Sequence, residues 1–365
     1  MALQCGIIGI ANVGKTTIFN SVSNTRGETH AFAFTGVKSN LGVVQVPDHR
    51  LYELHKYKPV EKIVPTTLEL VDIPGLTRGS GISESGSGRF LGDIRNTHAL
   101  IHVLRCFDSD SLPHNEGSVD PVRDIETIDL ELQVRDIESL EKKMERLQKI
   151  SRSGDKDAVH TQQVLGRYRE HIEGFNNART LAVRDDERKY IDDLSLLTMK
   201  PVMYVCNVDG ESAVRGNRHT DGVREFLKGK DAEILIIAGV LEAEIAELEN
   251  KEDRTAFLKD AGLDEPGVDK LVRAAYRLLD LQTFFTMGPK EIRAWTIKKG
   301  MTASQAAGVV HSDMERGFIR AEVMKYNDFI ALGSEHACRE AGKLHVEGKN
   351  YIVADGDIIY VRFNV

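Results

Sequence analysis

The sequence predicts an α/β protein: a mostly parallel sheet with a phosphate-binding loop, an inserted antiparallel helical hairpin, and a smaller domain with a mixed sheet. Three observations lead to this prediction. A Gly-Lys-Thr motif lies between a short apolar strand and a helix close to the first residue. Apolar residues recur at steps of three and four through a charged central stretch. Beyond Phe284, short alternating strands replace the earlier pattern.

The segment Gly9–Thr16 fits the pattern G-x-x-x-x-G-K-[ST] of a phosphate-binding loop, or P-loop. Leu3–Ile10 is predicted to be a strand and Thr16–Val22 the first turns of a helix, which is the context that the motif requires. Backbone N–H groups of such a loop turn inward around a phosphate at a helix N-terminus. Lys15 and Thr16 are the predicted catalytic residues, because Lys15 neutralises terminal phosphates and Thr16 reaches a magnesium ion. The loop's predicted nucleotide-binding residues are Asn12, Val13, Gly14, Lys15, Thr16 and Thr17.

The predicted magnesium site draws on two further segments. The strand Thr67–Val71 runs into Asp72-Ile73-Pro74-Gly75, a D-x-x-G motif at the distance after a P-loop that makes it informative. Asp72 is expected to hold the ion through a water, and the Gly75 N–H to contact the terminal phosphate. Thr35, in the loop after the first helix, is the third candidate metal ligand, and a solvent-facing threonine is an equal alternative.

The residue after Gly75 is Leu76, where Ras-like GTPases place a glutamine that orients the attacking water. A leucine side chain has no donor or acceptor, so hydrolysis must be slow, use another group or need a partner. The stretch 79–92 is rich in Gly and Ser. We expect it to be mobile and to order when a ligand or partner holds it, a plain flexible linker being the alternative.

The central stretch predicts a helical hairpin that interrupts the nucleotide-binding fold. Its two apolar series meet across a break at 151–155. The charged outer face is either solvated or a docking arm for a large partner. The predicted seam consists of Leu130, Val134, Ile137, Leu140, Met144, Leu147, Leu165, Tyr168, Ile172 and Phe175.

The strand Pro201–Cys206 leads into the segment that reads the base in nucleotidases of this kind. Asn207 and Val208 are expected to line the base pocket. Gly210 stands where GTPases carry the aspartate that accepts from two N–H groups of guanine, so guanine selectivity should be weak. Asp209 or Glu211 could replace that acceptor only if the loop shifts.

Composition excludes several classes of protein. The chain has 365 residues and a formal net charge of −8, so no large basic field for DNA is expected. No apolar run approaches the length of a membrane span, and the start of the chain goes directly into a strand rather than a secretory signal. The four cysteines are far apart and predict buried free thiols in a reducing compartment, hence a cytoplasmic protein.

The last 80 or so residues predict a separate domain of ordinary size. Thr302 is placed to cap a short helix through Val310. Asp355-Gly356 predicts a tight turn. The predicted strands are Ile292–Ile297, Ile319–Tyr326, Tyr351–Val353 and Ile358–Phe363.

Together these motifs resemble the YchF / Obg-like ATPase family, within the Obg-related translation-factor GTPases. The resemblance covers nearly the whole chain. Besides the P-loop, it is carried by the runs Val71–Leu76, Ile101–Phe107, Glu116–Pro121, Asn207–Asp209, Glu242–Glu244, Phe284–Thr286, Gly317–Glu322 and Asp355–Asp357.

The resemblance implies a Ras-like G domain over 1–124 and 196–282, an inserted coiled-coil domain over 125–195, and a TGS domain of ubiquitin-like β-grasp fold over 283–365. It implies cytosolic binding and hydrolysis of ATP in preference to GTP, with magnesium. It also implies association with ribosomes, through the large subunit or between the subunits. In related potassium-activated nucleotidases the P-loop asparagine helps to hold K⁺, which assigns that role to Asn12.

Three departures from the family pattern stand out. The magnesium-loop threonine of the family falls on Gly36, one place after Thr35. The acidic residue of the family's N-x-x-E falls on Gly210. The loop after Gly79 carries serines in place of several family glycines and lacks the histidine of some members.

Three hypotheses follow. The first is a magnesium-dependent ATPase that switches between ribosome-bound and free states, with slow hydrolysis. The second is a nucleotide-gated ribosome- or RNA-binding module with negligible turnover, which Leu76 and Gly36 favour. The third is a GTPase of the same fold, against which Gly210 argues.

Overall fold

The computed structural model describes residues 3–24, 39–74, 87–109, 111–114, 116–152 and 155–364. The chain forms two compact units. The first contains Met1–Gly42 and Glu69–Lys270, and the second contains Val43–Leu68 and Leu271–Val365. The sequence analysis placed 43–68 with the nucleotide-binding part, whereas these residues pack into the second unit. The four-part domain division remains a prediction.

The first unit is built on a mostly parallel sheet. Its central strand β5 is buried at every position, as expected for a strand covered on both faces. The P-loop strand β1 pairs in parallel with β4 and β5, and β5 continues in parallel to β6 and β7. In spatial order the strands are β2 (Asn40–Gln45), β4 (Thr67–Asp72), β1 (Gln4–Ile8), β5 (Ala99–Arg105), β6 (Val202–Asn207) and β7 (Ile234–Ile237).

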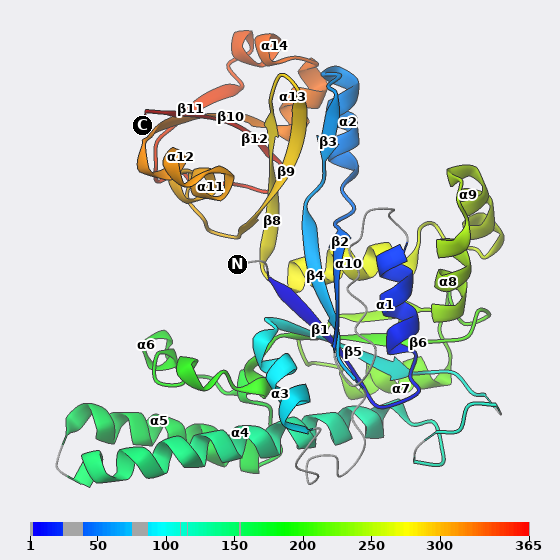
Figure 1. Ribbon diagram of the computed structural model, residues 1–365, viewed down its shortest axis with the longest axis vertical. Helices are drawn as coiled ribbons and strands as arrows, with labels where there is room; N and C mark the ends of the chain where they lie inside the picture. The colour runs from blue at the N-terminus through cyan, green and yellow to red at the C-terminus, as the bar shows by residue number, and fades with distance from the viewer. Residues whose placement is uncertain are drawn as a thin grey trace. The chain divides into compact units, whose positions relative to one another are not determined.

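Helices surround this sheet (Figure 1). They are α1 (Lys15–Asn24), α3 (Ser87–Asn96), α7 (Arg218–Phe226), α8 (Gly239–Glu247) and α9 (Lys251–Asp260). Helix α10 (Gly267–Leu278) begins in the first unit and continues into the second. Of the stretch 79–92 that was predicted to be mobile, 79–86 lie outside the described residues and the rest belongs to α3, so its mobility stays a prediction.

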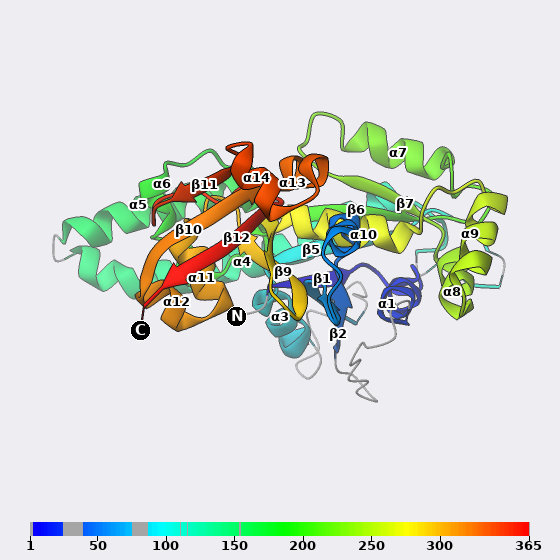
Figure 2. The same cartoon turned by 90° about the horizontal axis from the view of Figure 1, so that it is seen from above.

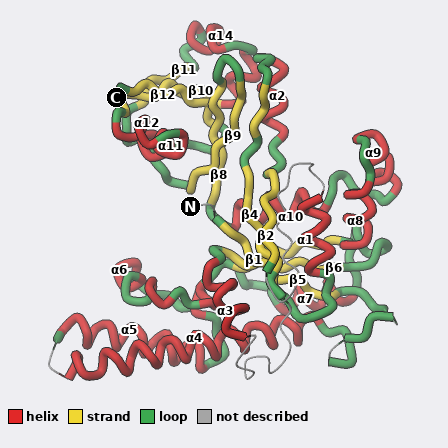
Figure 3. Tube along the Cα trace, viewed as in Figure 1, coloured by secondary structure: helices red, strands yellow, loops and turns green. Residues whose placement is uncertain are grey.

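The inserted hairpin is confirmed: α4 (Pro121–Arg152) and α5 (Lys156–Glu173) lie side by side (Figures 1 and 3). Asp155 ends the break by accepting a hydrogen bond from the Ala158 N–H at 2.9 Å. The return passes through α6 (Asp185–Arg188) and the 3-10 turns η1 (Ala178–Thr180), η2 (Asp192–Leu194) and η3 (Leu197–Met199). The buried seam contains Leu140, Val164, Leu165, Tyr168, Ile172, Ala178, Ile191 and Leu196.

Three predicted seam residues are exposed instead. Leu130, Val134 and Phe175 are 47%, 42% and 76% exposed. The first part of α4 packs through other positions, such as Ile128 and Leu132, because it lies on the sheet rather than on α5. Phe175 lies after the end of α5 with φ +60°, so the chain has already left the helical register.

Asp136 fixes the base of the hairpin. Its carboxylate is 1% exposed and accepts hydrogen bonds from the Leu197 and Thr198 N–H groups at 2.7 and 2.8 Å. It also accepts from the Thr198 hydroxyl at 2.7 Å. These bonds hold the return segment where it enters β6.

The second unit contains a mixed sheet with a hydrophobic cluster on each face. Figure 2 shows β10, β12 and β11 side by side, and β10 is antiparallel to both neighbours. In spatial order the strands are β11 (Leu344–Glu347), β10 (Phe318–Lys325), β12 (Asp357–Phe363), β8 (Leu281–Met287), β9 (Glu291–Lys298) and β3 (Lys62–Val64). The helices are α2 (His49–Tyr57), α11 (Ala303–Val310), α12 (Ser312–Arg316), α13 (Tyr326–Leu332) and α14 (Glu335–Glu340).

Helix α2 explains why 43–68 belongs to this unit. Its Leu51 and Leu54 are buried in one cluster with Phe285 and Ile358 of the sheet. The predicted helix over 302–310 is confirmed, and the Thr302 hydroxyl accepts from the Gln305 N–H. The predicted strand Tyr351–Val353 is reduced to a single bridge between Ile352 and Thr302.

Two predictions from composition can be compared with the structure. All four cysteines are buried and free. Among the described residues, no helix combines the length and apolar character that a membrane crossing requires.

Candidate functional site

The P-loop joins the end of β1 to the start of α1 and needs its two glycines for steric reasons. Gly9 has φ +150°, and a Cβ there would lie 2.5 Å from the Val103 carbonyl oxygen. Gly14 has φ +91°, and a Cβ there would lie 2.2 Å from Asn207 Nδ2. The first N–H groups of α1 have no partner within the helix, so the loop and the helix start together form an anion site.

Lys15 lies inside this loop. It is 7% exposed, and its Nζ donates a hydrogen bond to the Ile10 carbonyl oxygen at 2.7 Å. Burial lowers the pKa of Lys15 to about 8, although the nearby Asp72 carboxylate acts in the opposite direction. The ammonium is therefore poorly solvated and is poised to gain from an incoming phosphate.

Thr16 and Asp72 are brought together, as expected for two residues that share a metal ion. The Thr16 hydroxyl donates to Asp72 Oδ2 at 3.0 Å. Asp72 is 6% exposed, and its Oδ1 has no hydrogen-bond partner among the described residues. Burial raises the pKa of Asp72, while the Thr16 hydroxyl, the Lys15 ammonium and the Asn40 side chain oppose that rise.

This oxygen set fits magnesium, which prefers carboxylate, hydroxyl and water oxygens. A buried carboxylate oxygen without a donor is otherwise costly, and a metal-bound water would satisfy it. Thr16 would hold the ion directly and Asp72 through water. The ion would supply positive charge to the phosphate oxygens.

Asn207 connects the end of β6 to both sides of the site. Its Nδ2 donates to the Val13 carbonyl oxygen at 2.8 Å, and its Oδ1 accepts from the Gly239 N–H at 2.9 Å. Each end of the carboxamide retains capacity for one more hydrogen bond. Val208 is 2% exposed and packs in the cluster beside β6, so only its backbone is placed to contact a base.

The segment after Val208 has no carboxylate at the position that would accept from guanine, because that position is Gly210. The nearest atoms to a Cβ at Gly210 would be those of the Leu241 side chain, at 3.7 Å. Asp209 Oδ1 already accepts from the Ser212 N–H at 2.9 Å, and Glu211 is exposed.

The structure places the other predicted residues as follows. Asn12 is exposed on the loop with φ +64°, and Thr17 is exposed in the first turn of α1. Thr35 and Gly75, together with Leu76 and Gly36, lie outside the described residues.

The sequence pointed to two further residues beside the site without predicting their contacts. Gly239 follows the strand predicted over 233–237, where residues commonly close over the base, and Glu242 lies in a run that carries the family resemblance. The Gly239 N–H completes the contacts of Asn207, and the Glu242 carboxylate one turn later caps the start of α10. These contacts were not predicted, because both join segments far apart along the chain.

His102 is a buried titratable group near Lys15. It is 1% exposed on β5, with its ring centroid 5.7 Å from that of Tyr204. Burial, together with the charges of Lys15 and Arg179, lowers the pKa of His102 to about 3. The imidazole is therefore neutral at physiological pH.

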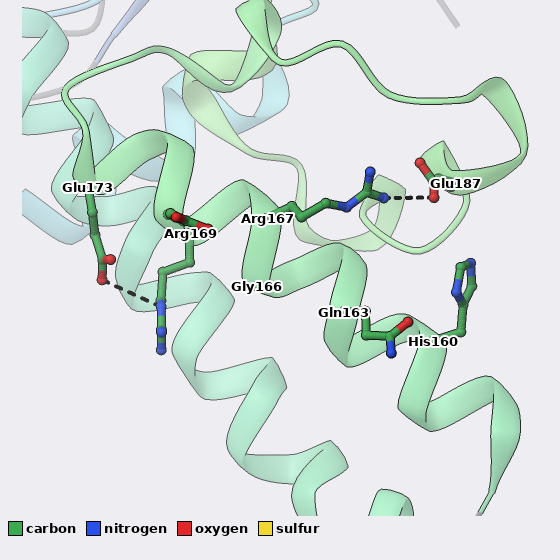
Figure 4. Close-up of a pocket in the computed structure, with 8 residues that line it drawn as sticks. His160, Gln163, Gly166, Arg167, Arg169, Glu173 and Glu187 are labelled. Carbon is green, nitrogen blue, oxygen red and sulfur yellow. Dashed lines mark ion pairs between the residues drawn. The ribbon is translucent and has the colours of Figure 1, made fainter.

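A polar depression on the hairpin, with a volume of about 620 Å³, is separate from this site (Figure 4). Its lining includes His160, Gln163, Arg167 and Glu187. Arg167 pairs with Glu187 at 2.7 Å, and Arg169 pairs with Glu173 at 3.5 Å. These arginines are paired internally, and none of the predicted site residues lies there.

The geometry can be compared with known proteins. The chain is 43% identical over 367 residues to the ribosome-binding ATPase YchF of Bacillus subtilis and 45% identical over 365 residues to the protein of that name from Haemophilus ducreyi. Each match covers 100% of both chains. The chain belongs to the YchF family. The solved structure of the Schizosaccharomyces pombe YchF GTPase matches with a TM-score of 0.87 at 31% identity, covering 99% of this chain and 97% of that one.

Two family models match separate parts of this chain. Residues 281–364 match the YchF C-terminal family described as "Protein of unknown function (DUF933)", and residues 4–161 match the family described as "50S ribosome-binding GTPase". The family resemblance and the predicted fold class are thereby confirmed: the first unit is a nucleotide-binding P-loop domain.

The steric role of Gly14 can be tested with Gly14→Ala. We expect nucleotide affinity to fall by at least about a hundredfold, about 2.7 kcal/mol, because the new Cβ meets Asn207 and the backbone is left-handed. Equilibrium binding of a fluorescent ATP analogue measures this loss. Gly166→Ala in α5, where a Cβ meets nothing within 4 Å, is the control and should bind as the wild type does. Equal affinity of both variants would refute the close approach.

The lowered pKa of Lys15 predicts proton uptake on nucleotide binding. In the free protein the ammonium loses its proton as pH rises through about 8, and a bound phosphate restores it. ATP affinity should therefore decline above pH 8, and at pH 8.5 binding should take up about three quarters of a proton. Titration calorimetry in two buffers of different ionisation enthalpy measures that uptake. Lys15→Arg, which stays protonated over this range, should show none; uptake that persists in this variant would assign it to another group.

Proposed function

We propose that this chain is a magnesium-dependent P-loop ATPase that hydrolyses ATP slowly, prefers ATP to GTP, and acts as a ribosome-associated switch. The observation that carries the proposal is the grouping of Lys15, Thr16 and Asp72 around the P-loop, where one buried carboxylate oxygen finds no donor in the described part of the chain. This grouping supports phosphoryl transfer chemistry, in which the protein's work is positioning and charge stabilisation.

The residues divide that work. The loop N–H groups and Lys15 bind the phosphates, and the bond from Lys15 to the Ile10 carbonyl keeps the ammonium directed into the loop. As negative charge shifts toward the bridging oxygen during transfer, Lys15 stabilises it. Leu76 has no group that could orient a water, which supports slow basal turnover. The assignments of Thr35 and Gly75, and a K⁺ site at Asn12, remain predictions.

Preference for ATP is supported by the surroundings of Gly210. GTPases hold guanine with a carboxylate that accepts from two N–H groups, and a site built in that way discriminates strongly. Here the corresponding position faces the apolar Leu241 side chain, and the neighbouring Asp209 is engaged by Ser212.

Association with ribosomes is supported by the names of the full-length relatives, which are ribosome-binding ATPases, and by the family model over residues 4–161. Such a partner agrees with the predicted cytoplasmic location. The contact is proposed at the large subunit or between the subunits. A nucleotide-gated binding module without turnover is the second candidate, and Leu76 is the feature that favours it.

Base selectivity is tested by equilibrium binding of ATP and GTP with magnesium. We expect the wild type to bind ATP at least about tenfold more tightly, about 1.4 kcal/mol. Gly210→Asp should shift the ratio toward GTP, because it restores an acceptor at a position with room for a Cβ. Gly222→Asp, which adds the same charge on the exposed face of α7, should leave the ratio unchanged. Tenfold preference of the wild type for GTP would overturn the assignment.

Turnover is tested by phosphate release from ATP with and without ribosomes. We expect slow release by the protein alone and faster release with ribosomes. Lys15→Ala should abolish both, because it removes the charge that stabilises the transferring group. Activity that persists in this variant comes from a contaminant or another site. ATP binding without release under either condition would favour the binding module.

A further inference from the structure

Glu242 is a buried carboxylate beside the nucleotide site that the proposed chemistry does not use. It lies in the first turn of α8 and is 2% exposed. Its Oε1 accepts from the Gly267 N–H at 2.7 Å and its Oε2 from the Val268 N–H at 3.3 Å. These are the first two N–H groups of α10, which have no partner within their own helix. The carboxylate therefore ties α8 to the positive end of α10.

The same turn of α8 also contacts the nucleotide site. Its first N–H, at Gly239, donates to Asn207 Oδ1, and Asn207 in turn holds the Val13 carbonyl oxygen of the P-loop. The Glu242 N–H bonds back to the Ala238 carbonyl oxygen at 3.0 Å, which makes Gly239 and Glu242 parts of one rigid turn. A continuous series of hydrogen bonds thus runs from the P-loop to α10.

Two glycines show how closely these segments approach. A Cβ at Gly239 would lie 3.0 Å from Asn207 Oδ1. A Cβ at Gly267 would lie 2.8 Å from Glu242 Oε1 and 3.3 Å from Ile237 Cγ1. Both approaches are too close for a side chain at either glycine. We therefore expect a displacement of the start of α10 to move the first turn of α8 as well.

Backbone N–H groups are the main groups that stabilise the charged form of Glu242 against its burial. Burial raises the pKa of this carboxyl group, and the Gly267 and Val268 N–H groups oppose the rise. Asp269 adds to the rise, and Lys270 opposes it. An apolar side chain would avoid this desolvation cost, but it would leave the two N–H groups of α10 without this acceptor. The carboxylate instead fixes α8 relative to the start of α10 through two directed hydrogen bonds.

We propose that Glu242 is a positioning residue for nucleobase binding: by anchoring the first turn of α8 to the start of α10, it holds the Gly239 N–H and the Asn207 carboxamide in place. The inference rests on the proposed function only in requiring that the chain binds ATP. The phosphates are bound by the N–H groups of the P-loop and by Lys15, and Asn207 contacts the loop only through the Val13 carbonyl oxygen. Glu242 should therefore affect the base side of the nucleotide much more than the phosphate side.

That distinction gives the test a readout that a purely structural role would not produce. ATP uses both sides of the site, whereas inorganic tripolyphosphate uses only the P-loop. In Glu242→Gln, one of the two backbone donors loses its acceptor. We expect the affinity for ATP to fall about tenfold, within the usual range for coupled sites, and the affinity for tripolyphosphate to change by less than about twofold.

A second variant guards against a folding defect in the first. Gly267→Ala keeps the carboxylate but displaces it, and it should weaken ATP binding with the same selectivity over tripolyphosphate. The matched control is Asp136→Asn, which alters another buried carboxylate that accepts from two backbone N–H groups. Those N–H groups lie before the start of β6, whereas Asn207 lies at its end. The strand between them is roughly 17 Å long. This control should lower the melting temperature and leave both affinities unchanged.

Three results would overturn the inference. Equal loss of ATP and tripolyphosphate affinity in Glu242→Gln and Gly267→Ala would show a general loss of structure. Unchanged ATP affinity with a lowered melting temperature, as in the control, would reduce Glu242 to a helix cap. A wild type that binds tripolyphosphate but not ATP would reject the proposed function itself.

Discussion

The carboxamide of Asn207 is the interaction that assembles the nucleotide site. It joins Val13, 194 residues earlier, to Gly239, 32 residues later, so its position depends on β6 lying beside β5 in the correct register. The helical hairpin is inserted between these two strands, and closing such a long loop has an entropic cost. Asp136 offsets part of that cost, because it fixes the return segment just before β6 begins. Formation of the nucleotide site therefore requires that the inserted hairpin folds and returns the chain to the sheet.

The first unit buries three charged side chains, those of Lys15, Asp72 and Glu242, and each has a different set of hydrogen-bond partners. Within the described ranges, Lys15 bonds to one backbone carbonyl oxygen, that of Ile10. Within the same ranges, Asp72 has one oxygen bonded to Thr16 and one without a donor. Glu242 has both oxygens satisfied by backbone N–H groups. A nucleotide phosphate would add a partner for Lys15, and a metal ion with its waters would add one for Asp72. Glu242 already has an N–H partner for each oxygen, and it holds α8 against the start of α10. Residual hydrogen-bonding capacity thus separates the binding groups from the supporting ones.

Sequence reasoning reached the elements whose signals are local. The P-loop, the hairpin and the cap at Thr302 each rest on residues within a few positions of one another. It failed where a partner lies far along the chain. It did not predict α2, whose Leu51 and Leu54 pack on Phe285 of the second unit. The periodicity of α4 continues through Leu130 and Val134, yet the helix changes neighbours there and leaves both exposed. In the site, Lys15, Thr16 and Asp72 follow from motifs, whereas the partners of Gly239 and Glu242 follow only from the folded contacts.

The four buried thiols have a use beyond their place in the core. Cys5, Cys106 and Cys206 lie in or next to the sheet of the first unit, and Cys338 lies in the second. Reagents that modify thiols can reach them only when the surrounding structure opens, so the rate of modification reports local opening. The native chain therefore contains its own probes of each unit's opening, without any introduced label. Comparing the reactivity of Cys338 with that of the other three would show whether the two units open together or separately.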